Sequence, residues 1–222
     1  MEHTMTHLGL SADEVLSTTR AVRKRLDFDR PVETSVIMEC LELAVQAPSG
    51  SNTQGWHFVI VTERDKIEAI SDLYARAFAA YRESPMYAGR VGAGEGEARE
   101  AQQARVASSA DYLAEHMHRS PALFIPCLHG RSEHPAAMVG QAGSIIPAAW
   151  SFMLAARERG LGTCWTTLHL RYEQEAAEVL GIPYEEMRQF ALSPIAYTQG
   201  TDFKAAARVD MDRVVSWNTY SA

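Results

Sequence analysis

Apolar residues recur along the chain at two spacings, and polar or proline-containing segments separate the patterned stretches. Spacing of three and four residues predicts helices, whereas a short continuous apolar run predicts a strand covered on both faces. The predicted helices cover residues 11–19, 33–47, 63–82, 98–118, 138–159 and 172–180. The predicted strands cover residues 58–61, 123–128, 162–167 and 190–197. Strands that alternate with helices predict a three-layer sandwich of the α+β or α/β class.

Local signals refine these elements. Ser11 followed by Glu14 forms a capping-box pattern at the start of the first predicted helix. Pro48 ends the second, because proline disfavours helical geometry in the residue before it. Pro126 lies inside a predicted strand and suggests an edge strand or a bend. Residues 89–103 are rich in Gly, Ala, Glu and Arg, so they bury little surface and predict a mobile excursion before the next helix.

Composition places the chain among globular proteins. Its 222 residues suit one domain, and 46% hydrophobic with 22% charged residues is ordinary for a soluble protein. A net charge of −7 argues against nucleic-acid binding, which usually needs surplus basic charge. The isolated Cys40, Cys127 and Cys164 predict reduced core thiols in the cytoplasm. The apolar stretch 145–156 is too short for a bilayer, and no signal-peptide pattern is evident, so no membrane partner is expected.

The segment Thr18–Arg25 concentrates positive charge within this acidic chain. On a helix, Arg20, Arg23 and Lys24 would share one face because they are three and four residues apart. Such a face is commonly a solvated basic surface. It also suits a phosphate, which guanidinium groups bind through charge-assisted hydrogen bonds. The segment alone leaves both interpretations open.

A small polar loop joins a predicted helix to the predicted strand 58–61. Its sequence, Ala47-Pro-Ser-Gly-Ser-Asn-Thr-Gln-Gly-Trp56, supplies two serines, an asparagine and a glutamine within six residues. These groups could hydrogen-bond a flat polar heterocycle or a phosphate from several directions. The same residue types are common in ordinary turns, so the loop by itself is also compatible with a plain connection.

Taken in order, these motifs resemble the FMN-dependent nitroreductase family. The matching residues are Arg20-Ala-Val-Arg23, Ala47-Pro-Ser49, Asn52-Thr-Gln-Gly-Trp56, the segment from Ser151 to the Gly160-Leu-Gly162 end, and the C-terminal Arg208. The resemblance covers most of the chain and is weak from Arg82 to Arg119. Ala21 and Thr19 depart from the polar and basic residues usual in the family, and Gly55 replaces a proline.

The resemblance implies the nitroreductase α+β fold, a three-layer α-β-α sandwich in an interlocked homodimer with FMN at the interface. Residues 82–119 would form a flap and residues 203–222 a dimer arm. It implies that FMN is bound by Arg20, Ala21, Arg23, Pro48, Ser49, Gly50, Asn52, Gln54, Trp165, Thr166, Thr167 and Arg208. Backbone amides near Thr166 and Thr167 would approach the flavin N5. The threonine-rich run is also similar to the iodotyrosine deiodinase branch.

The activity implied is that of an oxidoreductase with a ping-pong mechanism. NADH or NADPH would reduce FMN, which would then reduce a nitroaromatic, quinone or enone-like acceptor. No acid or base residue is required, and none is assigned. Two alternatives stay open, which are reductive dehalogenation on the same fold and a flavin-binding or storage protein without turnover.

Other chemistry-bearing motifs carry little weight. The glycine-rich Gly92–Gly96 has no clear strand before it, unlike a dinucleotide-binding loop. His116 and His118 face different ways on a helix. His129 and His134 lack a cysteine or carboxylate at ligand spacing, so no metal site is expected. A Gly-x-Ser-x-Gly elbow is absent from the sequence, which argues against the usual hydrolase.

Overall fold

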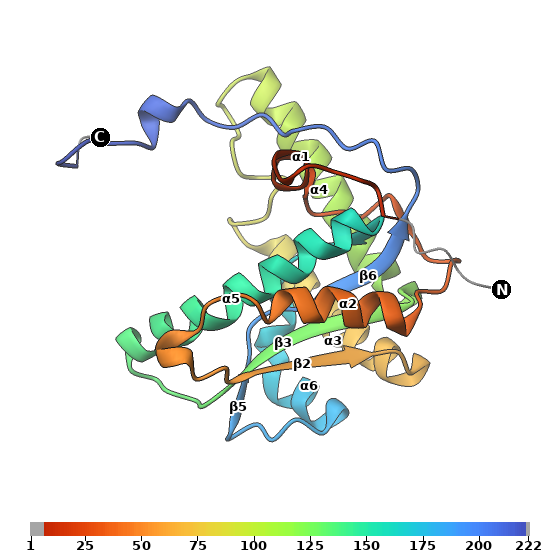
Figure 1. Ribbon diagram of the computed structural model, residues 1–222. Helices are drawn as coiled ribbons and strands as arrows, with labels where there is room; N and C mark the ends of the chain where they lie inside the picture. Colours follow the sequence, from red (N-terminus) through yellow and green to blue (C-terminus); the bar gives the residue numbers. More distant parts are fainter. Residues whose placement is uncertain (1–6, 221–222) are drawn as a thin grey trace.

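Two layers of helices enclose a six-stranded sheet in the computed structural model, which describes residues 7–220 (Figure 1). The helices are α1 (Ala12–Thr18), α2 (Thr34–Ala44), α3 (Arg64–Glu83), α4 (Glu97–His116), α5 (Pro135–Glu158) and α6 (Glu173–Leu180). The strands are β1 (Leu26–Asp27), β2 (Trp56–Val61), β3 (Ala122–His129), β4 (Leu161–Thr163), β5 (Met187–Gln189) and β6 (Ser193–Thr198). Four short 3-10 segments are η1 (Gly50–Asn52), η2 (Met117–Arg119), η3 (Leu168–Tyr172) and η4 (Met211–Arg213).

The sheet has the strand order β1-β6-β3-β2, with β4 paired to β6 and β5 paired to β3. Every pairing between named strands is antiparallel. Antiparallel pairing between segments separated by helices is typical of the α+β class rather than the α/β class. The predicted α+β fold class is therefore confirmed.

Strand β3 lies at the centre and divides the core into two layers. Its side chains alternate between the faces, as the period of a strand requires. Leu123, Ile125 and Cys127 pack with α3, α4 and α6. Ala122 and Phe124 pack with α2 and α5, where the Phe124 ring stacks 4.2 Å from the ring of Phe152. Nearly all of β3 is buried, so it supports both layers.

The suggestion that Pro126 marks an edge strand is wrong, because β3 is an interior strand. Pro126 pairs with Phe58 of β2, and its carbonyl oxygen accepts a hydrogen bond of 2.9 Å from Phe190 N. The N and C=O of one strand residue point to the same side, so the missing N–H faces away from β2. On that side β5 ends opposite Cys127 and β6 begins opposite Phe124. Proline therefore occupies the gap between two partner strands.

Two other strand predictions need correction. The predicted strand 162–167 is shorter, since β4 ends at Thr163 and only an isolated bridge joins Thr166 to Leu192. The predicted strand 190–197 begins three residues later, because β6 starts at Ser193, and the short strand β5 before it was not predicted. The two strands pair with different parts of β3. Strand β2 is an edge strand whose residues 58–60 are only half-buried. Both of its faces nevertheless pack on the core, as predicted, because Phe58 and Ile60 contact one layer and Val59 the other.

The predicted helices are present, and α1 carries the expected capping box. The Ser11 hydroxyl oxygen accepts from Glu14 N, and the Glu14 carboxylate accepts from Ser11 N at 2.8 Å. Helix α2 ends at Ala44, three residues before the end predicted from Pro48. The excursion after α3 contains a tight turn and leads into α4, close to the predicted helix 98–118.

Helix α5 packs on α2 and the sheet with one face and leaves an apolar stripe on another. Val139, Ile146 and Trp150 are exposed, and Gly143 continues their spacing of four and three residues. Exposed Met38, Leu43 and Val45 extend this apolar surface onto α2. By length and composition alone α5 could cross a bilayer, a test that core helices also pass.

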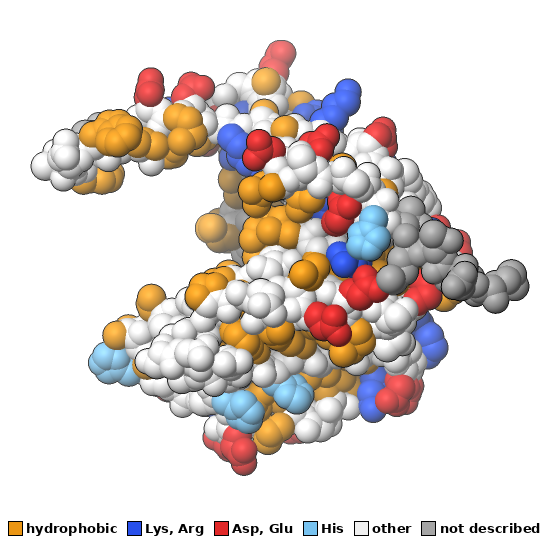
Figure 2. All heavy atoms as spheres, viewed as in Figure 1, with side chains coloured by type: hydrophobic (Ala, Val, Ile, Leu, Met, Phe, Trp, Pro, Cys, Tyr) orange, Lys and Arg blue, Asp and Glu red, His pale blue; other side chains and the backbone are white. Residues whose placement is uncertain are grey.

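The C-terminal segment after residue 208 projects from the body (Figures 1 and 2). It exposes large apolar side chains, which are Val209, Met211, Val214, Val215, Trp217 and Tyr220. Trp217 and Tyr220 are 85% and 89% exposed, so their apolar area contributes nothing to the core of this chain.

All three cysteines are buried and free. Burial raises the pKa of Cys40 and of Cys127 to about 12 and also raises the pKa of Cys164. The prediction of core thiols is confirmed for each of them.

One buried histidine makes stability depend on pH. His169 in η3 is fully buried, and neither ring nitrogen has a hydrogen-bond partner of good geometry. Burial lowers the pKa of His169 from 6.5 to about 4, although the nearby Gln189 side chain opposes the shift. The neutral ring is therefore the form that the folded core accepts.

We expect the His169 contribution to stability to be complete above pH 6.5 and to decline as pH falls toward 4. The unfolded chain takes up a proton in this window and the folded chain does not. The loss approaches roughly 3 kcal/mol, at about 1.4 kcal/mol per pKa unit. Urea unfolding of the parent and His169→Leu at several pH values measures the difference, with His134→Leu on the surface as control. Equal pH slopes for the parent and His169→Leu would contradict the assignment.

Candidate functional site

The basic segment is not helical, which corrects the prediction that Arg20, Arg23 and Lys24 share a helix face. Residues 19–25 form an extended stretch followed by a turn. Val22 N donates a hydrogen bond of 2.8 Å to Thr163 O, and Ala21 forms a parallel bridge with Thr163. This pairing with the end of β4 draws the segment out of helical geometry.

The basic residues nevertheless line one cavity of about 450 Å³. Its walls carry five cationic side chains and no carboxylate, and they come from Arg20, Arg23, Lys24, Arg25 and Arg105. Ser109 and Phe203 complete the lining together with Ala21 and Val22. We call this space the cationic cavity.

Most cations of this cavity donate to neutral oxygens. Arg20 donates to Lys204 O at 2.9 Å and Arg23 donates to Ser109 Oγ at 3.3 Å. Arg25 differs, because it forms an ion pair of 2.6 Å with Asp202 and lies over the ring of Phe203. The site therefore keeps positive charge that no carboxylate among residues 7–220 neutralises.

Arg157 of α5 adds positive charge behind the cavity. It is buried, and its guanidinium donates to Thr18 Oγ1 and Thr201 O, while Nη1 has no partner. Burial lowers the pKa of Arg157, and the nearby Arg25 lowers it further. A buried guanidinium with only neutral acceptors raises the electrostatic potential of this region.

A second cavity of about 270 Å³ adjoins the cationic cavity, and Arg23 lines both. It is surrounded by aromatic side chains of α3, by the middle of α4 and by the segment after β4. Its lining includes Tyr74, Phe78, Tyr81, Val106, Ala110 and residues 164–168. We call it the aromatic cavity. It holds the predicted residues Trp165, Thr166 and Thr167, so the structure brings these together with Arg23.

Within this run the backbone groups are not equivalent. Thr166 N donates to Leu192 O at 3.0 Å, and Leu192 N returns a bond of 2.8 Å to Thr166 O. The Thr166 amide is thus already used inside the chain. Thr167 is exposed, and among residues 7–220 its amide has no recorded backbone or side-chain acceptor. Thr167 is the member of the pair whose N–H can face a ligand.

The Thr166 side chain forms a hydrogen bond with the buried Tyr74. Burial raises the pKa of Tyr74 to about 12, and a hydrogen bond with Thr166 and the charge of Arg23 oppose this shift. Tyr74 is 3% exposed, so its hydroxyl depends on a partner inside the protein. Helical spacing marks Tyr74 only as a core position, so the sequence gives no signal of this contact.

Close backbone packing holds these segments together at Gly162. A Cβ placed there would lie 2.8 Å from Leu26 Cδ2, 2.8 Å from Thr198 Cγ2 and 3.0 Å from Val22 Cβ. Only glycine permits β4 to pass between β6 and the segment that carries Arg23. This gives a physical reason for the Gly160-Leu-Gly162 motif.

The predicted loop containing Pro48, Ser49, Gly50, Asn52 and Gln54 is built around left-handed residues. Ser51, Asn52 and Gln54 have φ angles of 51°, 53° and 50°. Such non-glycine conformations cost roughly 1–3 kcal/mol each and are enriched at functional sites.

Hydrogen bonds stabilise this loop. Gln54 N donates to Ser49 Oγ at 3.0 Å, and the Gln54 amide donates to Asn52 Oδ1 at 3.2 Å. Ser144 of α5 anchors it, since Gly50 N donates to Ser144 Oγ and Trp56 Nε1 to Ser144 O, both at 3.0 Å.

One chain does not bring this loop to the two cavities. The loop lies beside Ser144, whereas Arg23 lies beside Thr163, beyond the C-terminal end of α5 at Glu158. Fourteen residues of helix separate Ser144 from Glu158, which is about 21 Å along the axis. The loop and the cavities are therefore separate surfaces of this chain.

Arg208 is also outside the cationic cavity. It is exposed and lines a neighbouring cavity of about 600 Å³ with Glu95, Arg99 and Arg213. The preceding segment does reach the site, because Phe203 lines the cationic cavity and Lys204 accepts from Arg20.

The predicted flap contributes to both cavities. Val106 and Ala110 of α4 line the aromatic cavity, and Arg105 and Ser109 line the cationic one. The turn before α4 is tied down, because Tyr87 Oη donates to Asp111 Oδ2 at 2.8 Å. Sequence composition predicted the flap region but gave no indication of Arg105 and Ser109.

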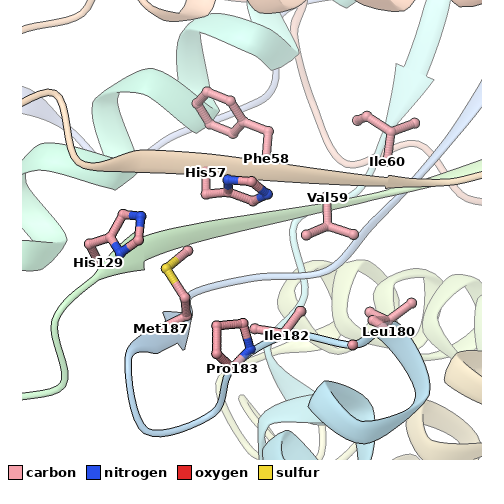
Figure 3. Close-up of a pocket in the computed structure, with 10 residues that line it drawn as sticks. His57, Phe58, Val59, Ile60, His129, Leu180, Ile182, Pro183 and Met187 are labelled. Carbon is pink, nitrogen blue, oxygen red and sulfur yellow. The ribbon is translucent and has the colours of Figure 1, made fainter.

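A further cavity of about 460 Å³ lies between β2 and the end of α6 (Figure 3). It is mostly apolar, with His57 and His129 on one side and Leu180, Ile182 and Pro183 on the other (Figure 3). None of the predicted site residues lines it. No group of three or more His, Cys, Asp and Glu side chains that could hold a metal occurs in the described part of the chain.

Comparison with known proteins gives a consistent result. The model of the nitroreductase family matches residues 16–197. The 4-nitrobenzoate reductase of Nocardioides sp. strain LMS-CY is 30% identical over 192 residues, which are 77% of this chain and 74% of that protein.

Two solved structures share the fold. The FMN and NADPH-dependent nitroreductase NfnB from Sphigopyxis sp. strain HMH has a TM-score of 0.69 at 24% identity, covering 95% of this chain and 100% of that chain. The oxidized iodotyrosine deiodinase bound to FMN and 3-iodo-L-tyrosine has a TM-score of 0.68 at 20% identity, covering 92% and 98%.

We expect Thr166→Val to destabilise the protein by about 1–3 kcal/mol, because it leaves the buried Tyr74 hydroxyl without this partner. The matched Thr167→Val at the adjacent exposed position should change stability by less than about 0.5 kcal/mol. Urea unfolding followed by circular dichroism measures both. Equal effects of the two substitutions would show that the Tyr74–Thr166 contact does not contribute.

Proposed function

The chain belongs to the nitroreductase family, and on that premise we propose that it is an FMN-dependent oxidoreductase that passes electrons from NADH or NADPH to nitroaromatic, quinone or enone-like acceptors.

The observation that carries the proposal is the meeting of the cationic and aromatic cavities at Arg23. FMN joins a flat aromatic ring system to a phosphate that carries close to two negative charges. The cationic cavity offers guanidinium groups without carboxylates, which suits the phosphate. The aromatic cavity beside it offers apolar walls for a ring. The residues present therefore fit the cofactor.

Each segment has a distinct role in this arrangement. Arg20 and Arg23 hold the phosphate, and Ala21 lies between them on the backbone bridge to Thr163. The amide of Thr167 would donate to the ring, because the amide of Thr166 already donates to Leu192 O. A donor fixed in place stabilises negative charge that develops on a ring nitrogen. When bound, the flavin supplies the electron transfer itself.

The remaining predicted residues come from a second copy of the chain. Pro48, Ser49, Gly50, Asn52 and Gln54 form an exposed loop distant from Arg23 of the same chain. A homodimer that buries the apolar stripe of α5 would let this loop approach the partner's cavities. The apolar tail, exposed in one chain, packs on the partner as a dimer arm.

Residues 82–119 act as the flap of this site. The turn before α4 and the α4 face of Val106 and Ala110 cover the aromatic cavity. Changes in this segment would alter which acceptors reach the ring. The name of the Nocardioides relative supports a nitroaromatic acceptor.

We expect the protein to purify yellow with noncovalent FMN, to bleach with NADH or NADPH without oxygen, and to recover colour when 4-nitrobenzoate is added. Arg23→Ala should weaken FMN binding by about 1.5–3 kcal/mol, roughly ten- to a hundredfold. Titration of apoprotein with FMN measures this. Riboflavin, which lacks the phosphate, should bind the parent and variant almost equally.

The control is Arg76→Ala, whose guanidinium pairs with Glu175 outside both cavities. Arg208→Ala should affect FMN less than Arg23→Ala, and an equal loss would mean that the C-terminal segment moves into the cavity. Bound FMN that no nicotinamide bleaches would indicate a storage protein. Iodide release from 3-iodotyrosine, with no reduction of 4-nitrobenzoate, would indicate a dehalogenase.

We expect a homodimer with a mass near twice 24.6 kDa. Ile146→Glu places a charge in the α5 stripe and should shift sedimentation equilibrium toward the monomer, because the buried interface would have to desolvate the carboxylate. Met86→Glu, at an exposed apolar residue outside α2 and α5, is the control. A parent protein that is monomeric with FMN bound would overturn the two-chain site.

A further inference from the structure

The cationic cavity holds more positive charge than one FMN phosphate needs. Of its five cations, Arg25 is already paired with Asp202, which leaves four. A phosphate monoester carries at most about two negative charges near neutral pH. Arg20 and Arg23 suffice for that phosphate, so Lys24 and Arg105 remain without an anion.

Neither residue forms an ion pair with a carboxylate of the described chain. Arginines such as Arg76, Arg119 and Arg188 form ion pairs with carboxylates at 2.6–2.9 Å. Lys24 instead donates to the neutral Ser108 Oγ at 2.8 Å, and Arg105 has no recorded partner in the described chain. In a chain of net charge −7, unpaired cations gathered in one cavity indicate an anionic ligand rather than a solvated surface.

The two cations form one subsite with donors on α4. Arg105, Ser108 and Ser109 are three and four residues apart, so they share a helix face. Lys24 reaches that face through Ser108, and Arg23 reaches it through Ser109. Ammonium, guanidinium and hydroxyl donors around one point suit a phosphate monoester.

We propose that Lys24 and Arg105 bind the 2′-phosphate of NADPH and make the protein prefer NADPH to NADH. This rests on the proposed function, because it assigns a second anion to the same site. Both residues line the cationic cavity but not the aromatic one. The 2′-phosphate is separated from the nicotinamide by two riboses and a pyrophosphate, so it can lie away from the ring that reacts.

The same placement argues against the carboxylate of an aromatic acceptor. In nitrobenzoate the carboxylate is attached directly to the ring. A cation that binds it would therefore have to line the aromatic cavity, as Arg23 does and as Lys24 and Arg105 do not.

The test uses the oxidised, FMN-loaded protein, so no turnover is involved. Isothermal titration compares adenosine 2′,5′-bisphosphate with 5′-AMP, which lacks the 2′-phosphate. We expect the bisphosphate to bind at least about tenfold more tightly at low salt. The difference should shrink as ionic strength rises, because the cations are close to solvent.

Lys24→Met and Arg105→Gln should each reduce this preference by at least about fivefold while the protein keeps its FMN, as judged by absorbance. Lys66→Met, at a lysine paired with Glu63 on α3, and Arg99→Gln, six residues earlier on α4 and outside the cationic cavity, are the matched controls. Both controls should retain the preference of the parent.

Two failures are distinguishable. A parent that binds no FMN would remove the proposed function. A parent that binds FMN but shows equal affinity for the two nucleotides, or variants that keep the full preference, would overturn the 2′-phosphate subsite alone. Weaker binding of 4-nitrobenzoate, relative to nitrobenzene, in Lys24→Met and Arg105→Gln would assign the subsite to the acceptor instead.

Discussion

The absence of a side chain at Gly162 is the constraint on which the site depends. Three segments meet around this backbone at distances that no Cβ could share. Because β4 lies this close to Val22, the amide of Val22 can bond Thr163 O, and the basic segment follows the strand instead of forming a helix. The chain after β4 then turns directly past Tyr74 of α3. The cationic cavity and the aromatic cavity therefore adjoin because of this backbone packing.

The electrostatics of the molecule follow from how its charges are paired. Acidic residues outnumber basic ones, yet the cationic cavity has no carboxylate in its walls. Many carboxylates are engaged elsewhere, as in the half-buried Arg131–Glu173 pair at 2.6 Å and the Arg159–Glu39 pair at 2.9 Å. Because these carboxylates are paired away from the cationic cavity, the cavity keeps a local positive field in a protein of negative net charge. Such a field attracts anions over about a Debye length, roughly 8–10 Å at ordinary salt.

The sequence predicted those features that local chemistry determines. Ser11 and Glu14 specify the start of α1, and helical periodicity located the helices. Features set by tertiary pairing could not be predicted in the same way. Local spacing gives no sign that β4 will pair with Val22, or that two strands will meet β3 on either side of Pro126. The candidate site shows the same division. The order of motifs predicted Arg23 and Thr167, which do line the cavities, whereas Arg105 and Tyr74 are brought there by the packing of α3 and α4.

The burial of all three thiols has a consequence for how this protein opens. At neutral pH each sulfur is protonated and inaccessible, so an aqueous thiol reagent cannot reach it in the closed fold. Cys40 lies in the layer of α2 and α5, whereas Cys127 and Cys164 lie in the layer of α3, α4 and α6. The labelling rate of each cysteine therefore reports the opening of its own layer. The chain carries natural probes of whether the two halves of its core unfold together or in succession.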